Sequence, residues 1–407
     1  MLQNEVNTMK RALLFIVAIA ATALGSAQAN LIARLRPGAN PTAIAQQYGI
    51  TFREQAPDAP FYLFFVPAPL DVHVIQAQML TNANVIWAED DANLVMPESA
   101  GGGRGSTVAV INDRGRAQAA NTGALAQVGF SRAFTQTAGR LVRIAILDTG
   151  LAPSGTPLWS KTAAQYNAID GQGMAYDMAR GVDSNQNSIP DEGVGHGTFV
   201  AGVVDQLSPY SRLVIVRVAD SDGNATAWSL IKGVSFAVKS GCEVGNISLG
   251  SADAVPALGD VLEWARLNGV FFIAAAGNEN RNMLYDPAGI SKVLAVTGID
   301  RFNIKATFAN YNGDIESCAP ATGILSYGPR GQMMVWSGTS FAAPFVSGAL
   351  VECLRHLPTK INPEAIYSRI KDSGRSVNNV NPNYRNELGL KLWIPDLWSK
   401  IRAVRVP

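Results

Sequence analysis

The chain has 407 residues, of which 47% are hydrophobic and 16% are charged, and its formal net charge is +1. This composition indicates a globular protein with a large buried core, long enough for two or three domains, and excludes an intrinsically disordered chain. A net charge so close to zero gives no strong field that would attract nucleic acid or an anionic membrane, so neither is an expected partner.

The N-terminus has the pattern of a secretory signal peptide. Lys10 and Arg11 precede an apolar run over residues 12–24, which is followed by small residues ending in Ala27-Gln28-Ala29. This pattern predicts export with cleavage after Ala29. An N-terminal anchor is the alternative, but the run is short for a membrane span. We therefore assign residues 1–29 to a signal peptide and expect a secreted protein, extracellular or periplasmic.

Residues 30–99 are predicted to form a small α+β unit. Its apolar pattern gives strands and helices in the order β-α-β-α-β, which is compatible with a ferredoxin-like fold. The predicted strands are 30–35, 61–66 and 85–89, and the predicted helices are 41–48 and 72–81. The glycine-rich run 101–106 then indicates a flexible linker, so residues 100–137 are assigned to a linker and the first segment of the next unit.

The longest part of the chain, residues 138–400, is predicted to be one α/β domain. Near-continuous apolar segments alternate with helical patterns, which is typical of a parallel sheet covered on both faces. The predicted strands are 141–147, 213–218, 245–249, 270–275 and 293–297, and the clearest helices are 226–239 and 257–267. Ligands of such sheets meet the carboxyl ends of the strands, so functional residues are expected there.

The segment Gly338-Thr339-Ser340-Phe341-Ala342-Ala343-Pro344 carries the strongest local signal. It places a serine among small residues, directly before an apolar helical pattern over residues 345–357. The free N–H groups and dipole of a helix N-terminus favour negative charge, as a nucleophilic serine requires. An ordinary serine N-cap would give the same local pattern, so the assignment of Ser340 depends on partners elsewhere.

Two further segments supply the partners that a serine nucleophile needs. Asp148 follows the first predicted core strand, although a turn-forming aspartate is the alternative at that place. His196 stands at the start of a small-residue helix. The other two histidines, His73 and His356, are more simply surface or cap residues, so His196 is the candidate base by elimination.

Asp148, His196 and Ser340 occur in the order Asp…His…Ser, which is the order found in subtilisin. An α/β-hydrolase would need the order Ser…Asp…His and a glycine at position 342, where this chain has Ala342. The chain resembles the subtilisin-like serine peptidases over residues 138–357, and its N-terminal unit resembles the propeptide of that family. The matching motifs are Ile144-Ala145-Ile146-Leu147-Asp148-Thr149-Gly150, Gly195-His196-Gly197-Thr198, Ala274-Ala275-Ala276-Gly277-Asn278 and the segment around Ser340.

This resemblance implies a three-layer, parallel-sheet α/β catalytic domain with an Asp-His-Ser triad. Asp148 would orient His196, His196 would take and return the proton, and Ser340 would attack the carbonyl carbon to form an acyl-enzyme. Asn278, together with a backbone N–H near Ser340, would bind the oxyanion. The resemblance implies no cofactor for this chemistry.

The resemblance also implies a groove for extended polypeptide substrates. A strand on one side and a second segment on the other would pair with the peptide through backbone hydrogen bonds. The residues assigned to these two sides and to the pocket for the residue before the scissile bond are Ser248, Leu249, Gly250, Gly223, Ala275, Ala276 and Gly277. The pocket residues are small and include no obvious acidic residue, which argues against strict basic specificity.

A polar loop before His196 resembles calcium-binding loops. Asp183, Asn185, Asn187 and Asp191 supply alternating side-chain oxygens, but Ser188 replaces the usual turn glycine. A structural calcium at these four residues is one interpretation, and a polar loop without metal is the other.

The three cysteines are Cys242, Cys318 and Cys353. One pair could form a disulfide after export, and the sequence does not decide which. None has the spacing of metal ligands, and all stand in apolar surroundings, so buried inert thiols are expected.

Together these patterns predict a secreted, monomeric serine endopeptidase that is made as a zymogen. The N-terminal unit would assist folding and would act as an intramolecular inhibitor, with its tail near residues 93–99 in the substrate groove until it is cut. Two alternatives remain. One is a catalytically silent relative that binds proteins, and the other is a non-enzymatic αβ binding protein whose motif matches are coincidental.

Overall fold

The computed structural model describes residues 29–96, 109–111, 121–135 and 138–404. Two compact units are present: one lies within the first 91 residues, and the other runs from Ala92 onwards and includes residues 56–59. The predicted signal peptide, apart from Ala29, and the glycine-rich run 101–106 lie outside the described residues. None of the helices in the described part combines the length and apolar character needed to cross a membrane.

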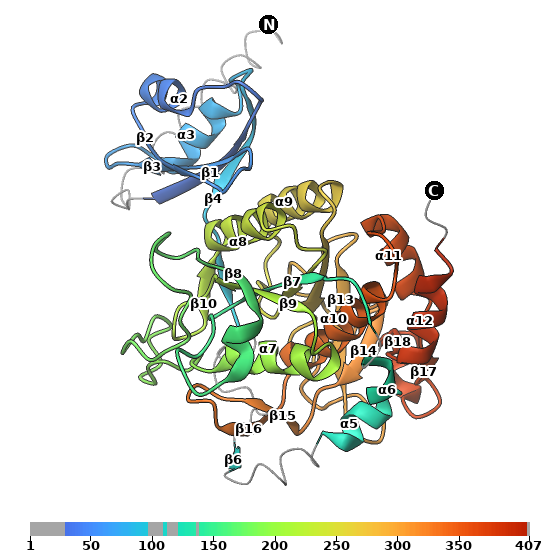
Figure 1. Cartoon of the computed structure of the whole chain (residues 1–407). Helices are drawn as coiled ribbons and strands as arrows, with labels where there is room; N and C mark the ends of the chain where they lie inside the picture. The colour runs from blue at the N-terminus through green and yellow to red at the C-terminus, as the bar shows by residue number, and fades with distance from the viewer. Residues whose placement is uncertain (1–28, 97–108, 112–120, 136–137, 405–407) are drawn as a thin grey trace, which may run out of the picture. The chain divides into compact units, whose positions relative to one another are not determined.

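The N-terminal unit, blue in Figure 1, is a four-stranded antiparallel sheet with two helices. Its elements are β1 (Ala29–Leu35), α2 (Pro41–Tyr48), β2 (Thr51–Gln55), β3 (Phe61–Val66), α3 (Val72–Met79) and β4 (Val85–Asp90). The sheet order β2-β3-β1-β4 is that of a ferredoxin-like fold, as predicted. The sequence pattern misses β2, because this strand has a single apolar residue and no buried side chain.

Each helix of this unit begins at a polar residue that caps it. The side chain of Asn40 accepts hydrogen bonds from the N–H groups of Thr42 and Ala43 at the start of α2. Asp71 caps α3 in the same way. These caps satisfy N–H groups that a helix N-terminus leaves unpaired, which explains why both helices begin where they do.

The larger unit is built on a nine-stranded sheet in the order β17-β18-β14-β13-β12-β11-β7-β9-β8. Its strands are β7 (Arg143–Asp148), β8 (Thr162–Asn167), β9 (Arg212–Arg217), β11 (Val244–Ile247), β12 (Phe271–Ala275), β13 (Leu294–Ile299), β14 (Ser317–Pro320), β17 (Arg375–Ser376) and β18 (Leu390–Lys391). All neighbours are parallel except β17 with β18. The five predicted strands form the centre of the sheet. The strands that the pattern misses lie toward its two edges, where the outermost ones are less buried.

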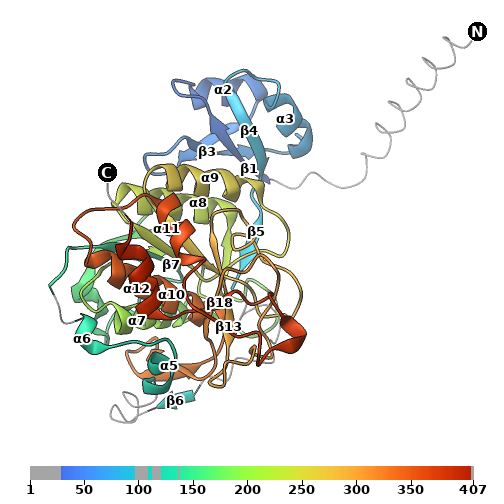
Figure 2. The same cartoon turned by 90° about the vertical axis from the view of Figure 1, so that its right-hand side faces the viewer.

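Helices cover both faces of this sheet, so the unit has three layers (Figure 1 and Figure 2). Helices α7 (His196–Leu207) and α10 (Thr339–Arg355) pack on one face, and α8 (Ala227–Lys239) and α9 (Pro256–Leu267) pack on the other. Helices α8 and α9 agree with the predicted helices to within one residue at each end. A capping box of Thr226 and Ser229 explains where α8 begins.

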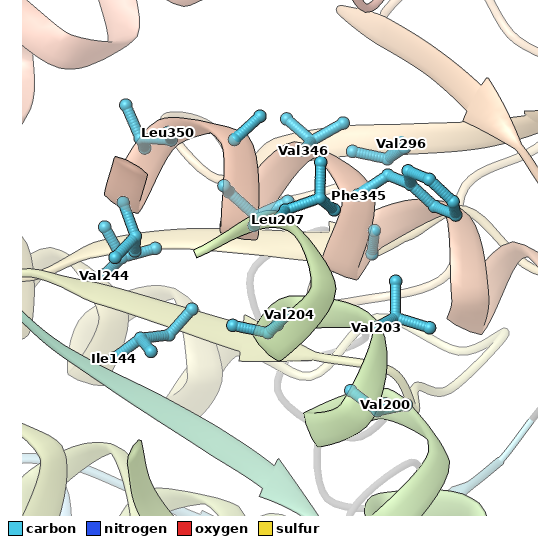
Figure 3. Packing of buried hydrophobic residues seen from close by; sticks show 14 of the residues in the cluster. Ile144, Val200, Val203, Val204, Leu207, Val244, Val296, Phe345, Val346 and Leu350 are labelled. Atoms are coloured by element: carbon cyan, nitrogen blue, oxygen red, sulfur yellow. The ribbon is translucent and has the colours of Figure 1, made fainter. Parts of the chain in front are cut away.

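The main core lies between α7, α10 and the sheet, as Figure 3 shows. The side chains labelled there are at most 1% exposed; they are Ile144, Val200, Val203, Val204, Leu207, Val244, Val296, Phe345, Val346 and Leu350. Gly348 allows the two helices to approach closely, because a Cβ at this position would lie 2.9 Å from the Cβ of Leu207. The first turns of the two helices also adjoin, since the rings of His196 and Phe341 are 5.3 Å apart. Helices α7 and α10 therefore run in the same direction and begin at the same end.

Smaller elements complete the unit. Strand β5 (Asn93–Val95) pairs with β10 (Asn224–Thr226), and β15 (Ile324–Tyr327), β16 (Met333–Trp336) and β6 (Ala109–Ile111) form a three-stranded sheet. The other helices among the described residues of this unit are α5 (Thr122–Gln127), α6 (Arg132–Thr135), η1 (Pro157–Lys161), α11 (Pro363–Ile370), η2 (Pro382–Tyr384) and α12 (Ile394–Arg402).

The three cysteines are buried free thiols, as predicted. Cys242, Cys318 and Cys353 are at most 2% exposed, and none of the three takes part in a disulfide. Burial raises the pKa of Cys242 and Cys318 to about 12, and it raises the pKa of Cys353 as well. These thiols are therefore protonated at neutral pH and poorly reactive.

Candidate active site

Three neighbouring strands bring the predicted functional residues to one edge of the sheet. Strands β12, β11 and β7 are adjacent and parallel, so their carboxyl ends lie together. Asp148 is the last residue of β7, Ser248 directly follows β11, and Asn278 comes three residues after β12. His196 is the first residue of α7, and Ser340 is the second residue of α10.

Asp148 and His196 form a buried carboxylate–imidazole pair. Oδ1 of Asp148 lies 2.8 Å from Nδ1 of His196, and both side chains are at most 1% exposed. The N–H of Thr149 donates to the same oxygen at 2.8 Å. Because a carboxylate accepts, Nδ1 carries the proton of a neutral ring and Nε2 is the basic nitrogen. Trp336 and Phe341 pack against the imidazole, with ring centroids 5.6 and 5.3 Å away.

Ser340 lies inside the first turn of α10 and is held by Ser248. Its Oγ donates to the Ser248 carbonyl at 3.1 Å, and the Ser248 hydroxyl donates to the Ser340 carbonyl at 3.0 Å. The N-cap of this helix is Gly338, so the alternative of an ordinary serine N-cap is excluded. Ser340 therefore carries its hydroxyl on a helix N-terminus, beside the segment that presents His196.

Thr339 orients the side chain of Asn278. The amide oxygen of Asn278 accepts hydrogen bonds from the N–H and from the hydroxyl of Thr339, both at 2.9 Å. These two donors fix which end of the amide is oxygen, and the amide nitrogen is the end that can donate. The residue before Asn278 must be a glycine. The φ angle of Gly277 is +108°, and a Cβ at this position would lie 2.3 Å from Nδ2 of Asn310.

Asp177, a residue that sequence reasoning misses, anchors the start of α7. One carboxylate oxygen accepts the N–H of Gly195 at 2.9 Å, and the other accepts the N–H and the hydroxyl of Thr198 at 3.2 and 2.7 Å. Burial raises the pKa of Asp177, and these three hydrogen bonds act against the rise. Asp177 therefore holds the turn that presents His196. It stands in an irregular segment without periodic apolar residues, so only its tertiary contacts reveal it.

An extended segment of the chain itself lies along the residues assigned to substrate binding. Val95 of β5 exchanges two backbone hydrogen bonds with Gly250, each at 2.9 Å. On its other side β5 pairs antiparallel with β10, and the N–H of Met96 donates to the carbonyl of Gly223 at 3.0 Å. Strand β5 is thus hydrogen-bonded on both sides, to Gly250 on one and to β10 on the other. Leu249, the neighbour of Gly250, is buried in the core.

The segment assigned to the pocket for the residue before the scissile bond carries an acidic neighbour. Ala275, Ala276 and Gly277 are buried at and after the end of β12. Oε2 of Glu279 lies 2.9 Å from the place of a Cβ on Gly277. Asn310 holds this carboxylate, since its Nδ2 donates to Oε2 at 2.9 Å. A carboxylate therefore lies beside the segment expected to lack one, and its place directly after the Ala-Ala-Gly-Asn run is the signal that points to it; the lining of the pocket stays a prediction.

The predicted calcium loop is closed by hydrogen bonds to its own backbone. Asp183 accepts hydrogen bonds from two N–H groups of this loop. Asp191 accepts hydrogen bonds from three N–H groups of the segment before it. The side-chain amides of Asn185 and Asn187 donate to Glu192. Burial raises the pKa of Asp191, but polar groups around it, among them three N–H groups that donate to the carboxylate, outweigh burial and lower this pKa to about 2. The predicted ligands would have to exchange these partners to hold a cation, and calcium binding stays a prediction.

The fold and the site together define a class of protein. A buried Asp–His pair beside a serine at a helix N-terminus is the arrangement of a serine hydrolase. A family model described as the subtilase family matches residues 139–389. Subtilisin DY from Bacillus licheniformis is 30% identical over 234 residues, covering 54% of this chain and 79% of that protein. The major intracellular serine protease of Bacillus subtilis (strain 168) is 31% identical over 227 residues, covering 52% and 68%.

Solved structures share this fold. Fervidolysin from Fervidobacterium pennivorans, a keratinolytic enzyme related to subtilisin, has a TM-score of 0.73 at 16% identity, and the match covers 94% of this chain and 62% of that chain. A cold adapted subtilisin-like serine proteinase has a TM-score of 0.52 at 24% identity, covering 62% and 88%. The family model matches more than half of the chain. The chain therefore belongs to the subtilase family, and it is a serine-type endopeptidase.

Proposed function

We propose that this chain is an exported endopeptidase, made as a zymogen, that cleaves extended polypeptides through Asp148, His196 and Ser340. The observation that carries the proposal is the 2.8 Å contact between Asp148 Oδ1 and His196 Nδ1, buried at the edge where α10 presents Ser340. Membership in the subtilase family supports it. The pattern of residues 1–29 supports export, and we propose a monomer.

In the proposed reaction, Nε2 of His196 takes the hydroxyl proton of Ser340 while Oγ attacks the carbonyl carbon of the scissile bond. Asp148 holds the ring in place and stabilises the imidazolium. The carbonyl oxygen becomes an oxyanion, to which the amide nitrogen of Asn278 and the N–H of Ser340 would donate. The C–N bond breaks as the imidazolium returns its proton to the leaving amine. Water then attacks the acyl-enzyme by the same steps and releases the acid.

Hydrolysis of casein by the purified protein tests this function. We expect Ser340→Ala to lower the rate at least about 10⁴-fold, because no other group replaces the nucleophile. Ser347→Ala is the matched control in the same helix; its hydroxyl bonds to Asn246 and Ala343, so the variant should keep its activity. A wild type without hydrolytic activity would instead favour the silent, protein-binding relative.

We further propose that residues 30–99 form an inhibitory propeptide whose tail lies in the substrate groove. Support comes from β5, which pairs with Gly250 and with β10 in the manner of an added strand. The side chains of Leu94 and Met96, two residues apart, are 0% exposed. The terminal carbon of Met96 lies 2.9 Å from the place of a Cβ on Gly193. Backbone pairing and two buried apolar side chains would together hold this tail in place.

A charge placed in the groove tests the inhibitory tail. In Met96→Asp a carboxylate would be buried against apolar surroundings, so the tail should leave the groove. We expect the lag before full activity, measured after export of the full chain, to shorten severalfold. Asn93→Asp adds the same charge on an exposed face of β5 and is the matched control. Equal lags in the two variants and in the wild type would contradict the inhibitory role of the tail.

We keep a structural calcium at Asp183, Asn185, Asn187 and Asp191 as a separate proposal. Carboxylate and amide oxygens of this spacing are ligands that Ca²⁺ prefers. Titration with calcium should raise the melting temperature of the wild type and leave that of Asp183→Ala unchanged. An unchanged wild-type melting temperature would dismiss the metal and leave the polar loop.

A further inference from the structure

Tyr285 lies beside the strand segment that the proposed function assigns to substrate binding. Ser251 exchanges two backbone hydrogen bonds with Asp286, each at 2.9 Å, so residues 285–286 run along one edge of this segment. Gly250, the residue before, pairs with β5 on the opposite edge. The Cβ of Tyr285 lies 3.1 Å from the place of a Cβ on Gly250. Tyr285 is only 8% exposed, so its ring is packed inside the protein.

The other end of the tyrosine reaches the opposite wall of the pocket. The carboxylate of Glu279 is close enough to act on its hydroxyl, and burial together with this carboxylate raises the pKa of Tyr285 to about 12. Glu279 adjoins Gly277, with Oε2 only 2.9 Å from the place of a Cβ there. The phenol and the carboxylate therefore span the space between Gly250 and Gly277, the two glycines that would flank the side chain before the scissile bond.

The carboxylate of Glu279 is held in place by Asn310. Asn310 donates to Oε2 of Glu279 at 2.9 Å and accepts the Glu279 N–H at 3.1 Å. The same asparagine holds the segment further, since its N–H donates to the Gly277 carbonyl at 3.0 Å. The ring of Tyr285 is 8% exposed, so moving it aside would disturb the packing around it, which is costly. A large substrate side chain therefore cannot enter between Gly250 and Gly277 without a cost in free energy.

We infer that Tyr285 closes this pocket and makes the enzyme select substrates with glycine, alanine or serine before the scissile bond. The inference rests on the proposed function. Aromatic and long aliphatic side chains are excluded by the ring, because a packed site rejects added volume. Lysine and arginine are excluded as well, although Glu279 is acidic, because the ring leaves no room for a long side chain and Asn310 already binds the carboxylate. Arg281 is also nearby, and its positive charge disfavours a lysine or arginine side chain of the substrate.

A series of peptide p-nitroanilides that differ only in the last residue tests this inference. We expect wild-type kcat/KM for alanine to exceed that for phenylalanine and lysine by about tenfold or more, within the range that pocket size gives. In Tyr285→Gly the ratio of phenylalanine to alanine should rise about 100-fold. Tyr285→Phe keeps the ring and loses only the hydroxyl, so it is the matched control and should still prefer alanine.

The outcomes separate this inference from the proposed function. A wild type that cleaves the phenylalanine substrate fastest overturns the role of Tyr285 while it upholds the endopeptidase. An unchanged ratio in Tyr285→Gly also overturns it. If that variant fails to fold, the wild-type ratio alone decides. A wild type that cleaves no anilide and has no reactive serine overturns the proposed function and, with it, this inference.

Discussion

Helices α7 and α10 begin in the same way but are anchored differently. Both start at a glycine N-cap without a side-chain cap, and each carries a residue of the proposed triad in its first turn. The first turn of α7 is held by the carboxylate of Asp177, and that of α10 by the amide oxygen of Asn278. One anchor can carry a negative charge, and the other is neutral.

The difference matches what each helix start must do in the proposed reaction. An imidazolium forms on His196, and a nearby carboxylate favours a positive charge. An oxyanion forms beside Ser340, and a carboxylate there would oppose it. A neutral amide serves both needs of α10: its oxygen anchors Thr339 and its nitrogen can donate. The two anchors therefore differ in charge because the two helices face charges of opposite sign.

The largest expected effect comes from changing the neutral anchor. We expect Asn278→Ala to lower kcat about 10²–10³-fold with little change in KM, because one oxyanion donor is lost. Asn278→Asp keeps an acceptor for Thr339 but replaces the donor with a negative charge, so its kcat should fall at least as far. Steady-state kinetics with one peptide substrate measure both. A loss of kcat in the aspartate variant that is much smaller than the loss in the alanine variant would contradict the account of this anchor.

A smaller effect is expected from neutralising the charged anchor. Asp177→Asn keeps the size of the side chain but leaves the donors of Thr198 facing an N–H₂ group. A charge at a helix N-terminus contributes about 1 kcal/mol, so kcat/KM should fall about fivefold. Loss of the negative charge disfavours the imidazolium, so the acidic limb of the pH–rate profile should move to lower pH.

The control for this effect is Thr198→Val, which removes one hydrogen bond to Asp177 and keeps its charge. This variant should lose stability without moving the acidic limb. The pH–rate profiles of Asp177→Asn and Asn278→Ala can then be compared. Only Asp177→Asn should shift the profile. A shift of the same size in both would show that the two anchors do not act on different charges.

Sequence reasoning reaches the residues that stand in short motifs at strand ends and helix starts. Asp148 ends an apolar strand, and His196 and Ser340 stand in the first turns of small-residue helices, so the pattern marks these three residues. The five central strands are visible for the same reason, since burial on both faces makes them continuously apolar. Ser248 is reached through the resemblance to the subtilisin-like peptidases.

The rest depends on contacts between segments far apart in the chain. Asp177 lies 19 positions before His196 in an irregular loop, and its role appears only when its carboxylate meets Gly195 and Thr198. Nothing in the sequence around Tyr285 marks it as functional, and its role is inferred only from its closeness to Glu279 in the structure. Strand β2 and the outer strands of the large sheet are missed because their faces are less buried. The sequence pattern therefore predicts secondary-structure elements and short motifs. The residues that anchor the helix starts or line the pocket are found only from contacts between distant segments of the chain.

Labelling with a fluorophosphonate, followed by peptide mass mapping, tests the central claim most directly. The account predicts one adduct, on Ser340, which is absent in Ser340→Ala and forms far more slowly in His196→Ala because the base is lost. Ser248 exchanges hydrogen bonds with Ser340 and provides an internal control within the same site. An adduct on Ser248, or no adduct on any serine of the active wild type, would contradict the account.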